Sequence, residues 1–217
     1  MATATSITTD APKATRRRGG KLLQAIYETT LTDLVNNGFE NLTFDKLAAA
    51  TGTGKASLYR RWSTPDELLM AALADPVVGY GDPVFPDKGN IRDDLIELLS
   101  HLAESLDRPH GRAMLLVLAH RTTRPELYEL VERMLLRPHE AMTLQAFEAG
   151  VERGEVDPDV VNERVLLMGS WLVTSEYNRH GQIDQSEVVA IIDEIILPVI
   201  TPRDSVERGG VVKAVES

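Results

Sequence analysis

The sequence predicts an all-α protein built from two helical parts, and three observations indicate this fold class. Apolar residues recur three and four residues apart along most of the chain. Cap residues followed by proline, or by glutamate three residues later, precede several of these stretches. A segment rich in proline and glycine, 75–89, separates the two parts. No stretch reads convincingly as a strand.

Charge is distributed unevenly between these two parts. The chain carries a net charge of −10, yet residues 1–62 hold nine Lys and Arg against five Asp and Glu, so the remainder contributes −14. The asymmetry indicates that one end approaches phosphate and the other is repelled by it. The chain has no cysteine, which excludes disulfides and thiolate metal sites. It also has no secretory signal and no apolar run of about 20 residues, so we expect a cytoplasmic protein without membrane association.

The first helix is expected over Lys21–Asn37, with Gly38 placed to end it. Residues 1–20 before it are predicted to be a disordered arm, because they are small and polar and lack periodicity. The arm closes with a basic cluster: Arg16, Arg17 and Arg18.

Residues 42–62 predict two short helices joined by a tight turn. Thr43 is a plausible N-cap of the first helix, because its hydroxyl can accept a backbone N–H bond. Gly52 and Gly54 supply backbone freedom where the chain reverses. The first helix has a small apolar face: Leu47, Ala48 and Thr51.

The second short helix, Lys55–Trp62, buries Leu58 and Trp62 on one side. Its other side is small, polar and basic, which suits entry into the major groove of DNA. The pair is therefore interpreted as a helix-turn-helix. The outward residues are Lys55, Ala56, Ser57, Tyr59 and Arg60.

This stretch resembles the DNA-binding domain of the TetR family of bacterial transcriptional regulators. The resemblance rests on Gly-x-x-Lys-x-Ser-Leu-Tyr-x-x-Trp, followed by Ser-Thr-Pro-Asp-Glu-Leu, and it extends over 22–73. It implies a DNA-binding domain over 21–75. Gly54 stands where the family usually has Ser or Thr, so one phosphate-contacting hydroxyl is missing. Arg61 and Trp62 replace the usual His and Phe.

The resemblance also implies which residues meet DNA. Thr43 should contact phosphate, although a pure N-cap role is the alternative, and Lys55 and Tyr59 match positions that hold the DNA backbone. Ala56, Ser57 and Arg60 are best placed for base edges, and a second phosphate contact is the alternative for Arg60. Arg16, Arg17 and Arg18 could reach the minor groove or the DNA backbone, or could be a solvated charge run.

The second part begins after a linker, 76–90, and extends over 91–202 before a flexible tail, 203–217. Thr64 and Pro65 start the helix that leads toward the linker. Beyond the linker we expect one helix that begins after Asn90, a second over 112–122, and a third that begins at Pro125 and ends at Gly150 and Gly154, with a kink or interruption at Pro138. A fourth helix should run from Pro158 to Gly181, and the last should begin after Asp184.

The last helix is apolar around more than one stripe, which predicts burial on two sides. The simplest second partner is the same surface of another copy, and the TetR resemblance likewise implies a homodimer formed through the last two helices. Two copies of the recognition helix could then read successive major grooves of a palindromic double-stranded DNA operator.

The second part could also enclose a ligand pocket between its helices. The side chains favoured for an unknown, largely apolar effector are Met114, Leu118, Phe147, Met168 and Trp171, with plain core packing as the alternative for each. The resemblance implies a repressor that ligand binding releases from DNA. One alternative is a ligand-independent DNA-binding dimer whose C-terminal domain serves only for dimerisation. Another is a small-molecule carrier that has lost operator binding.

Enzyme functions find little support in the sequence. His139-Glu140 lacks the second histidine of a zinc-protease helix, and Gly169-Ser170-Trp171 lacks the closing glycine of a nucleophile elbow. No phosphate-binding loop is present, and five scattered histidines without cysteine argue against a metal sensor. We therefore expect no catalytic site, metal site or cofactor.

Overall fold

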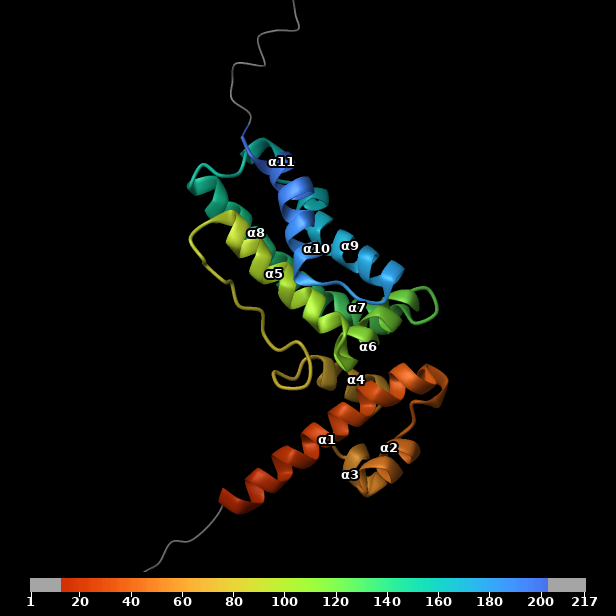
Figure 1. Cartoon of the computed structure of the whole chain (residues 1–217). Coiled ribbons are helices and arrows are strands. Elements are labelled where there is room, and N and C mark those ends of the chain that lie inside the picture. Colours follow the sequence, from red (N-terminus) through yellow and green to blue (C-terminus); the bar gives the residue numbers. More distant parts are fainter. Residues whose placement is uncertain (1–12, 203–217) are drawn as a thin grey trace, which may run out of the picture. The chain divides into compact units, whose positions relative to one another are not determined.

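A computed structural model describes residues 13–202, and the side chains from residue 19 onward (Figure 1). The described residues form helices and turns and no strand, as the sequence predicts. The chain divides into two compact units between Gly79 and Tyr80, inside the predicted linker. We call these unit 1 and unit 2. Among residues 13–202, no helix is both long and apolar enough to span a bilayer.

Unit 1 is a small helical domain drawn in red and orange in Figure 1. Its longest helix, α1, packs against α2 and α4. The elements are α1 (Lys13–Asn37), η1 (Phe39–Asn41), α2 (Phe44–Thr51), α3 (Lys55–Tyr59) and α4 (Pro65–Leu73). The most deeply buried side chains of its core are leucines from all four α-helices: Leu31, Leu34, Leu47, Leu58, Leu68, Leu69 and Leu73.

Helix α1 begins at Lys13, so the prediction of a disordered arm is wrong from that residue onward. The backbone of Arg16, Arg17 and Arg18 is helical. Lys, Ala and Arg are strong helix formers, and they outweigh the cost of about 1 kcal/mol that each of Gly19 and Gly20 adds. Residues 1–12 of the predicted arm lie outside the described part of the chain.

Unit 2 is a larger helical domain in which α5 contacts α6, α8, α9 and α10. Its elements are α5 (Ile91–Leu106), α6 (Pro109–Ala119), α7 (Pro125–Val131), η2 (Glu132–Leu136), α8 (Arg137–Glu152), η3 (Pro158–Val160), α9 (Glu163–His180), α10 (Gln185–Ala190), η4 (Ile191–Ile196) and α11 (Leu197–Ile200). Its buried cluster joins α5, α8, α9 and the last helical stretch through Leu95, Leu99, Phe147, Val173, Ile192 and Ile196. The predicted tail, 203–217, lies outside the described residues.

Two helix starts in unit 2 differ from the predictions. Helix α6 begins at Pro109 rather than Arg112, because proline suits the first helical position. Asp157 and Pro158 open only the short helix η3, and α9 begins at Glu163. The side chain of Asn162 provides the cap there, because its Oδ1 accepts from the backbone N–H of Arg164 at 3.1 Å.

Pro138 does not end its helix. A π-helical turn, η2, directly precedes α8, so the chain stays helical from Pro125 to Glu152. The same arrangement recurs where η4 precedes Pro198. A wider turn of this kind lets a helix pass a residue that lacks a backbone N–H. The predicted interruption is therefore a local change of helical hydrogen bonding.

Candidate DNA-binding surface and ligand cavity

The turn between α2 and α3 has the geometry that the sequence predicts. Thr43 caps α2, because its Oγ1 accepts from the backbone N–H of Lys46 at 3.4 Å. Gly52 adopts a left-handed conformation with φ of 64° and ends α2. Gly54 precedes α3 and contributes no side-chain cap. Helices α2 and α3 therefore form a helix-turn-helix.

The inner side of α3 is packed into the core of unit 1. Leu58 is 1% exposed and Trp62, just past the end of α3, is 8% exposed. The Trp62 ring meets Tyr27 of α1 edge to face, with centroids 6.0 Å apart. The Arg61 guanidinium lies 6.0 Å from the Trp62 ring centre. The prediction that Trp62 is a core residue is confirmed.

The outer side of α3 presents the predicted DNA-contacting residues. Lys55, Ala56, Tyr59 and Arg60 are exposed, and Ser57 is half-buried. Tyr59 is 59% exposed, while its ring packs edge to face on Phe44 at 4.7 Å. The Tyr59 side chain is therefore oriented by α2 even though most of it faces solvent. DNA contact by these residues and by Thr43 stays a prediction.

Two charged groups beside this surface were not singled out from the sequence. Asp45 of α2 forms an ion pair with Lys55, with Oδ2 and Nζ 2.6 Å apart. Both side chains are largely exposed, so the pair is weak and a phosphate can compete for the lysine. The exposed Lys46 donates from Nζ to Asn41 Oδ1 at 2.6 Å. The side chains of Arg16, Arg17 and Arg18 lie outside the described ones.

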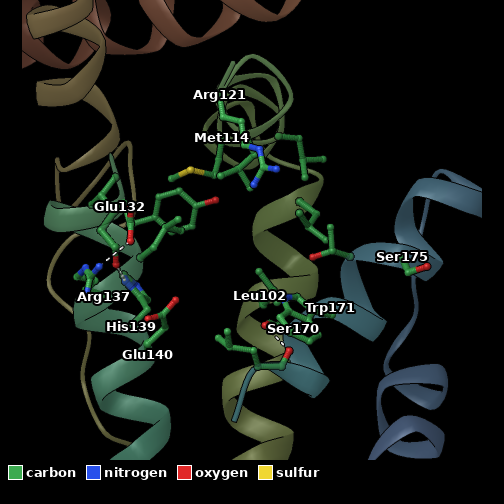
Figure 2. Close-up of a pocket in the computed structure, with 18 of the residues that line it drawn as sticks. Leu102, Met114, Arg121, Glu132, Arg137, His139, Glu140, Ser170, Trp171 and Ser175 are labelled. Carbon is green, nitrogen blue, oxygen red and sulfur yellow. Dashed lines mark hydrogen bonds and ion pairs between the residues drawn. The ribbon is translucent and has the colours of Figure 1, made fainter. Parts of the chain in front are cut away.

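A cavity of about 980 Å³ lies within unit 2. Its walls come from α5, α6, the stretch from α7 through α8, and α9 (Figure 2). The apolar part of the lining is formed by Leu102, Leu106, Met114, Leu115, Leu118, Leu135, Leu136, Leu167 and Trp171. Such a volume is within the range of small-molecule sites.

The residues predicted for an effector divide between this cavity and the core. Met114, Leu118 and Trp171 line the cavity. Phe147 is 1% exposed and belongs to the buried cluster of unit 2, and Met168 packs against that cluster. Neither of these two residues is part of the cavity lining.

Tyr80 is a lining residue that the sequence analysis missed. Its ring meets His110 at 4.8 Å and His139 at 5.8 Å, both edge to face. Burial raises the pKa of the Tyr80 hydroxyl to about 12, although a hydrogen bond with Ser105 opposes this shift. Tyr80 is therefore protonated at neutral pH. It stands alone in a segment without helical periodicity, so no pattern marked it.

Several charged groups of the lining are paired. Arg137 donates from Nη2 to Glu132 Oε1 at 2.8 Å, and Figure 2 shows this pair on the wall that also carries His139 and Glu140. On α9, Arg179 pairs with Glu176 at 3.1 Å.

Comparisons with known proteins agree with this architecture. The family model described as "Bacterial regulatory proteins, tetR family" matches residues 26–72. The model described as "Tetracyclin repressor-like, C-terminal domain" matches residues 85–195, more than half of the chain. The two matches together span the helix-turn-helix and the helices that wall the cavity.

Two curated relatives and two solved structures illustrate the similarity. An uncharacterized HTH-type transcriptional regulator of Mycobacterium tuberculosis, Rv1556, is 28% identical over 173 residues, covering 79% of this chain and 84% of the relative. The DNA-binding transcriptional repressor TetR of Mycobacteroides abscessus is 27% identical over 188 residues, covering 85% and 97%. The TetR family transcription regulator SCO0332 superposes with a TM-score of 0.57 at 22% identity, covering 84% of this chain and all of that one.

A putative transcriptional regulator from Saccharomonospora viridis, solved in complex with choline, superposes with a TM-score of 0.63 at 18% identity, covering 85% of this chain and all of that one. At such identities the two solved structures support the fold alone. The matched family models, together with the helix-turn-helix, show that the chain belongs to the TetR family of bacterial transcriptional regulators.

Proposed function

We propose that this regulator is a cytoplasmic homodimeric repressor that leaves a palindromic operator when a small molecule occupies the cavity of unit 2. The observation that carries the proposal is the cavity itself, at about 980 Å³. Protein interiors are normally close-packed, so a domain that served only for dimerisation would need no such space. The cavity therefore favours a ligand-responsive repressor over a ligand-independent dimer.

The recognition surface supports specific DNA binding. Arg60, which directly follows α3, is an exposed cation, and the small side chain of Ala56 on α3 leaves room for close approach to base edges. Lys55 and Tyr59 lie on the same surface, and each contacts α2, through an ion pair with Asp45 and through ring packing on Phe44. Positioning groups around one base-reading arginine are what a sequence-specific interface needs.

Exposed apolar side chains support a homodimer. Ile195 is 41% exposed and Val199 is 40% exposed, although Ile191, Ile192 and Ile196 of the same stretch are buried. Covering the exposed pair with a second copy would bury the remaining apolar face of this stretch. A two-fold dimer also presents two recognition helices for half-sites about 34–36 Å apart.

Release by a ligand requires that the ligand prefer the conformation with lower operator affinity. A coupling of about 1–3 kcal/mol changes operator affinity by roughly 5–150-fold. The curated similarity to a DNA-binding transcriptional repressor supports the repressing sign. The choline complex of a protein of similar fold supports a small-molecule site in this architecture.

The test begins by selecting an operator from random DNA with the purified chain. We expect one palindromic sequence, a footprint over two half-sites, and affinity that falls steeply with rising salt. A compound library is then screened for release of that operator. A carrier protein without DNA binding would select no sequence. A panel of cavity-binding compounds that never alters operator affinity would contradict the ligand-responsive part.

A further inference from the structure

One hydroxyl of the cavity lining uses its hydrogen-bond donor within the protein. The Ser170 hydroxyl donates to the Leu167 carbonyl oxygen at 2.9 Å. What Ser170 still offers a ligand is the lone pairs of its oxygen.

His139 contributes a further acceptor to the same lining. Its Nδ1 lies 2.7 Å from the Leu135 carbonyl oxygen. A carbonyl oxygen can only accept, so Nδ1 carries the proton of this bond. In the neutral ring Nε2 is then unprotonated and can accept a hydrogen bond.

Glu140, the next residue, is the strongest acceptor on this wall. It lines the cavity, and no ion pair or hydrogen bond engages its carboxylate among the described residues. Glu132 on the same wall is different, because Arg137 neutralises it at 2.8 Å. A ligand entering beside Glu140 therefore meets an uncompensated negative charge.

The opposite wall is suited to a cation with an apolar body. Figure 2 shows Leu102, Ser170 and Trp171 facing His139 and Glu140 across the cavity. An indole ring attracts a positive charge placed over its face. Leu102 and the leucines of α6 continue this wall as an apolar surface.

Arg121 is the competing feature of the lining. It is exposed, no ion pair engages it among the described residues, and it lies beside Met114 at the α6 end, away from Glu140 (Figure 2). An anionic ligand would have to bind there. The chain's net charge of −10 disfavours the approach of an anion and favours that of a cation.

We propose that the cavity takes a lipophilic amine, with its protonated nitrogen between the Glu140–His139 wall and Trp171 and its apolar part along Leu102, Met114 and Leu118. This inference rests on the proposed function, because it assigns the chemical class of the effector. The class is recognised by what the Glu140–His139 wall holds, namely an imidazole acceptor and a carboxylate that no cation pairs among the described residues.

The experiment compares decylamine, decanol and decanoate, which share one chain length and differ in their polar end. Trp62→Phe leaves Trp171 as the chain's only tryptophan, so its fluorescence reports on the cavity. Calorimetry on the unaltered full-length protein gives the same ranking without any substitution. We expect decylamine to bind at least tenfold more tightly than either of the others.

Glu140→Gln should reduce the preference for decylamine over decanol and decanoate about tenfold, because it keeps the shape of the side chain and deletes its charge. The matched control is Glu148→Gln, which removes one charge from an exposed residue of α8 outside the cavity lining and should leave the preference unchanged. Equal losses in both variants would mean that the acidic chain attracts amines without a site, and would overturn the proposal. Decanoate binding as tightly as decylamine would overturn it in favour of Arg121, and equal binding of decanol would overturn the role of charge.

The same measurements distinguish a failure of the proposed function from a failure of the proposed ligand class. If decylamine binds with the predicted preference but leaves operator affinity unchanged, ligand-driven release is contradicted while the ligand class stands. If the operator is released by compounds of another class and decylamine does not bind, the ligand class is contradicted while the repressor mechanism stands.

Discussion

The recognition surface of unit 1 and the cavity of unit 2 hold their side chains in different ways. In unit 1, close neighbours in sequence contact the exposed residues, as Phe44 packs on Tyr59 and Asp45 pairs with Lys55. In unit 2, the lining comes from segments spread between Tyr80 and Arg179. The first site is therefore encoded locally, while the second exists only once distant helices pack. Substitutions in the two units should differ accordingly.

The largest effect is expected in the core of unit 1. Leu58→Ala removes a fully buried side chain and should lower the free energy of unfolding by about 2–5 kcal/mol. Operator binding should be lost, while the cavity of unit 2 should still bind decylamine. Chemical denaturation measures the free energy of unfolding, and fluorescence titration measures the binding of operator and of decylamine. The matched control, Leu22→Ala, truncates an exposed leucine of α1 and should change stability by less than about 0.5 kcal/mol.

The second-largest effect is expected for substitutions in the proposed dimer interface. Ile195→Glu with Val199→Glu places charges on the exposed stripe of the last helical stretch. We expect sedimentation to show a monomer. Operator affinity should fall at least a hundredfold, or by about 2.7 kcal/mol, because a single unit 1 then contacts a single half-site. The melting temperature of unit 1 should stay unchanged. A variant that remains dimeric would show that the interface lies elsewhere.

Within the recognition surface, Arg60→Ala and Tyr59→Ala should differ in kind. Loss of a base-contacting arginine costs about 1–3 kcal/mol on the preferred operator and relaxes specificity at one base pair. Tyr59→Ala should weaken all sequences alike, because its predicted partner is phosphate. Binding measured against a panel of operator variants separates these patterns. A changed sequence preference for Tyr59→Ala would contradict the assignment.

The alkaline stability of unit 2 should depend on Tyr80. Its pKa is raised from 10.0 to about 12, so the unfolded chain loses this proton at lower pH than the folded one. The stabilisation is complete below pH 10 and is lost as pH rises toward 12. Tyr80→Phe cannot titrate and should lose less stability over this range, as denaturation at pH 9 and pH 12 would reveal. Identical pH profiles would contradict the buried environment of Tyr80.

The smallest effect is expected for the exposed pair between α2 and α3. Asp45→Asn should change stability by less than about 1 kcal/mol, because exposed ion pairs contribute little. Operator affinity should rise a few-fold, since Lys55 is freed and a negative charge near phosphate is removed. The matched control is Asp66→Asn on α4, outside the helix-turn-helix. If Asp45→Asn weakens binding, the ion pair orients Lys55 instead of competing with DNA.

Much of the fold follows from local chemistry. Thr43, Thr64, Asn90 and Asp184 all cap helices as predicted, because a cap depends on its nearest neighbours. The burial of Leu58 and Trp62 was likewise predictable from their spacing.

The errors come from competing local preferences. Helix α1 runs through Gly19 and Gly20 because the residues around them favour helix. Of the predicted kink or interruption at Pro138, the interruption is wrong, because a π turn keeps the chain helical there.

The cavity was less predictable, since helical spacing marks a residue as inward-facing without saying what it faces. Phe147 and Met168 have the same apolar pattern as Met114 and Leu118, yet they lie at the buried cluster. Tyr80 reaches the cavity through contacts with His110 and His139, which are distant in sequence. Only the packed structure separates core from lining.

The most direct test of the central claim is the stoichiometry of the operator complex, measured by sedimentation with and without a cavity ligand. Without ligand, the account predicts two chains bound to each palindromic operator. With saturating ligand, it predicts free DNA and a separate ligand-bound dimer. One chain per operator, or a complex that stays intact while the cavity is filled, would contradict it.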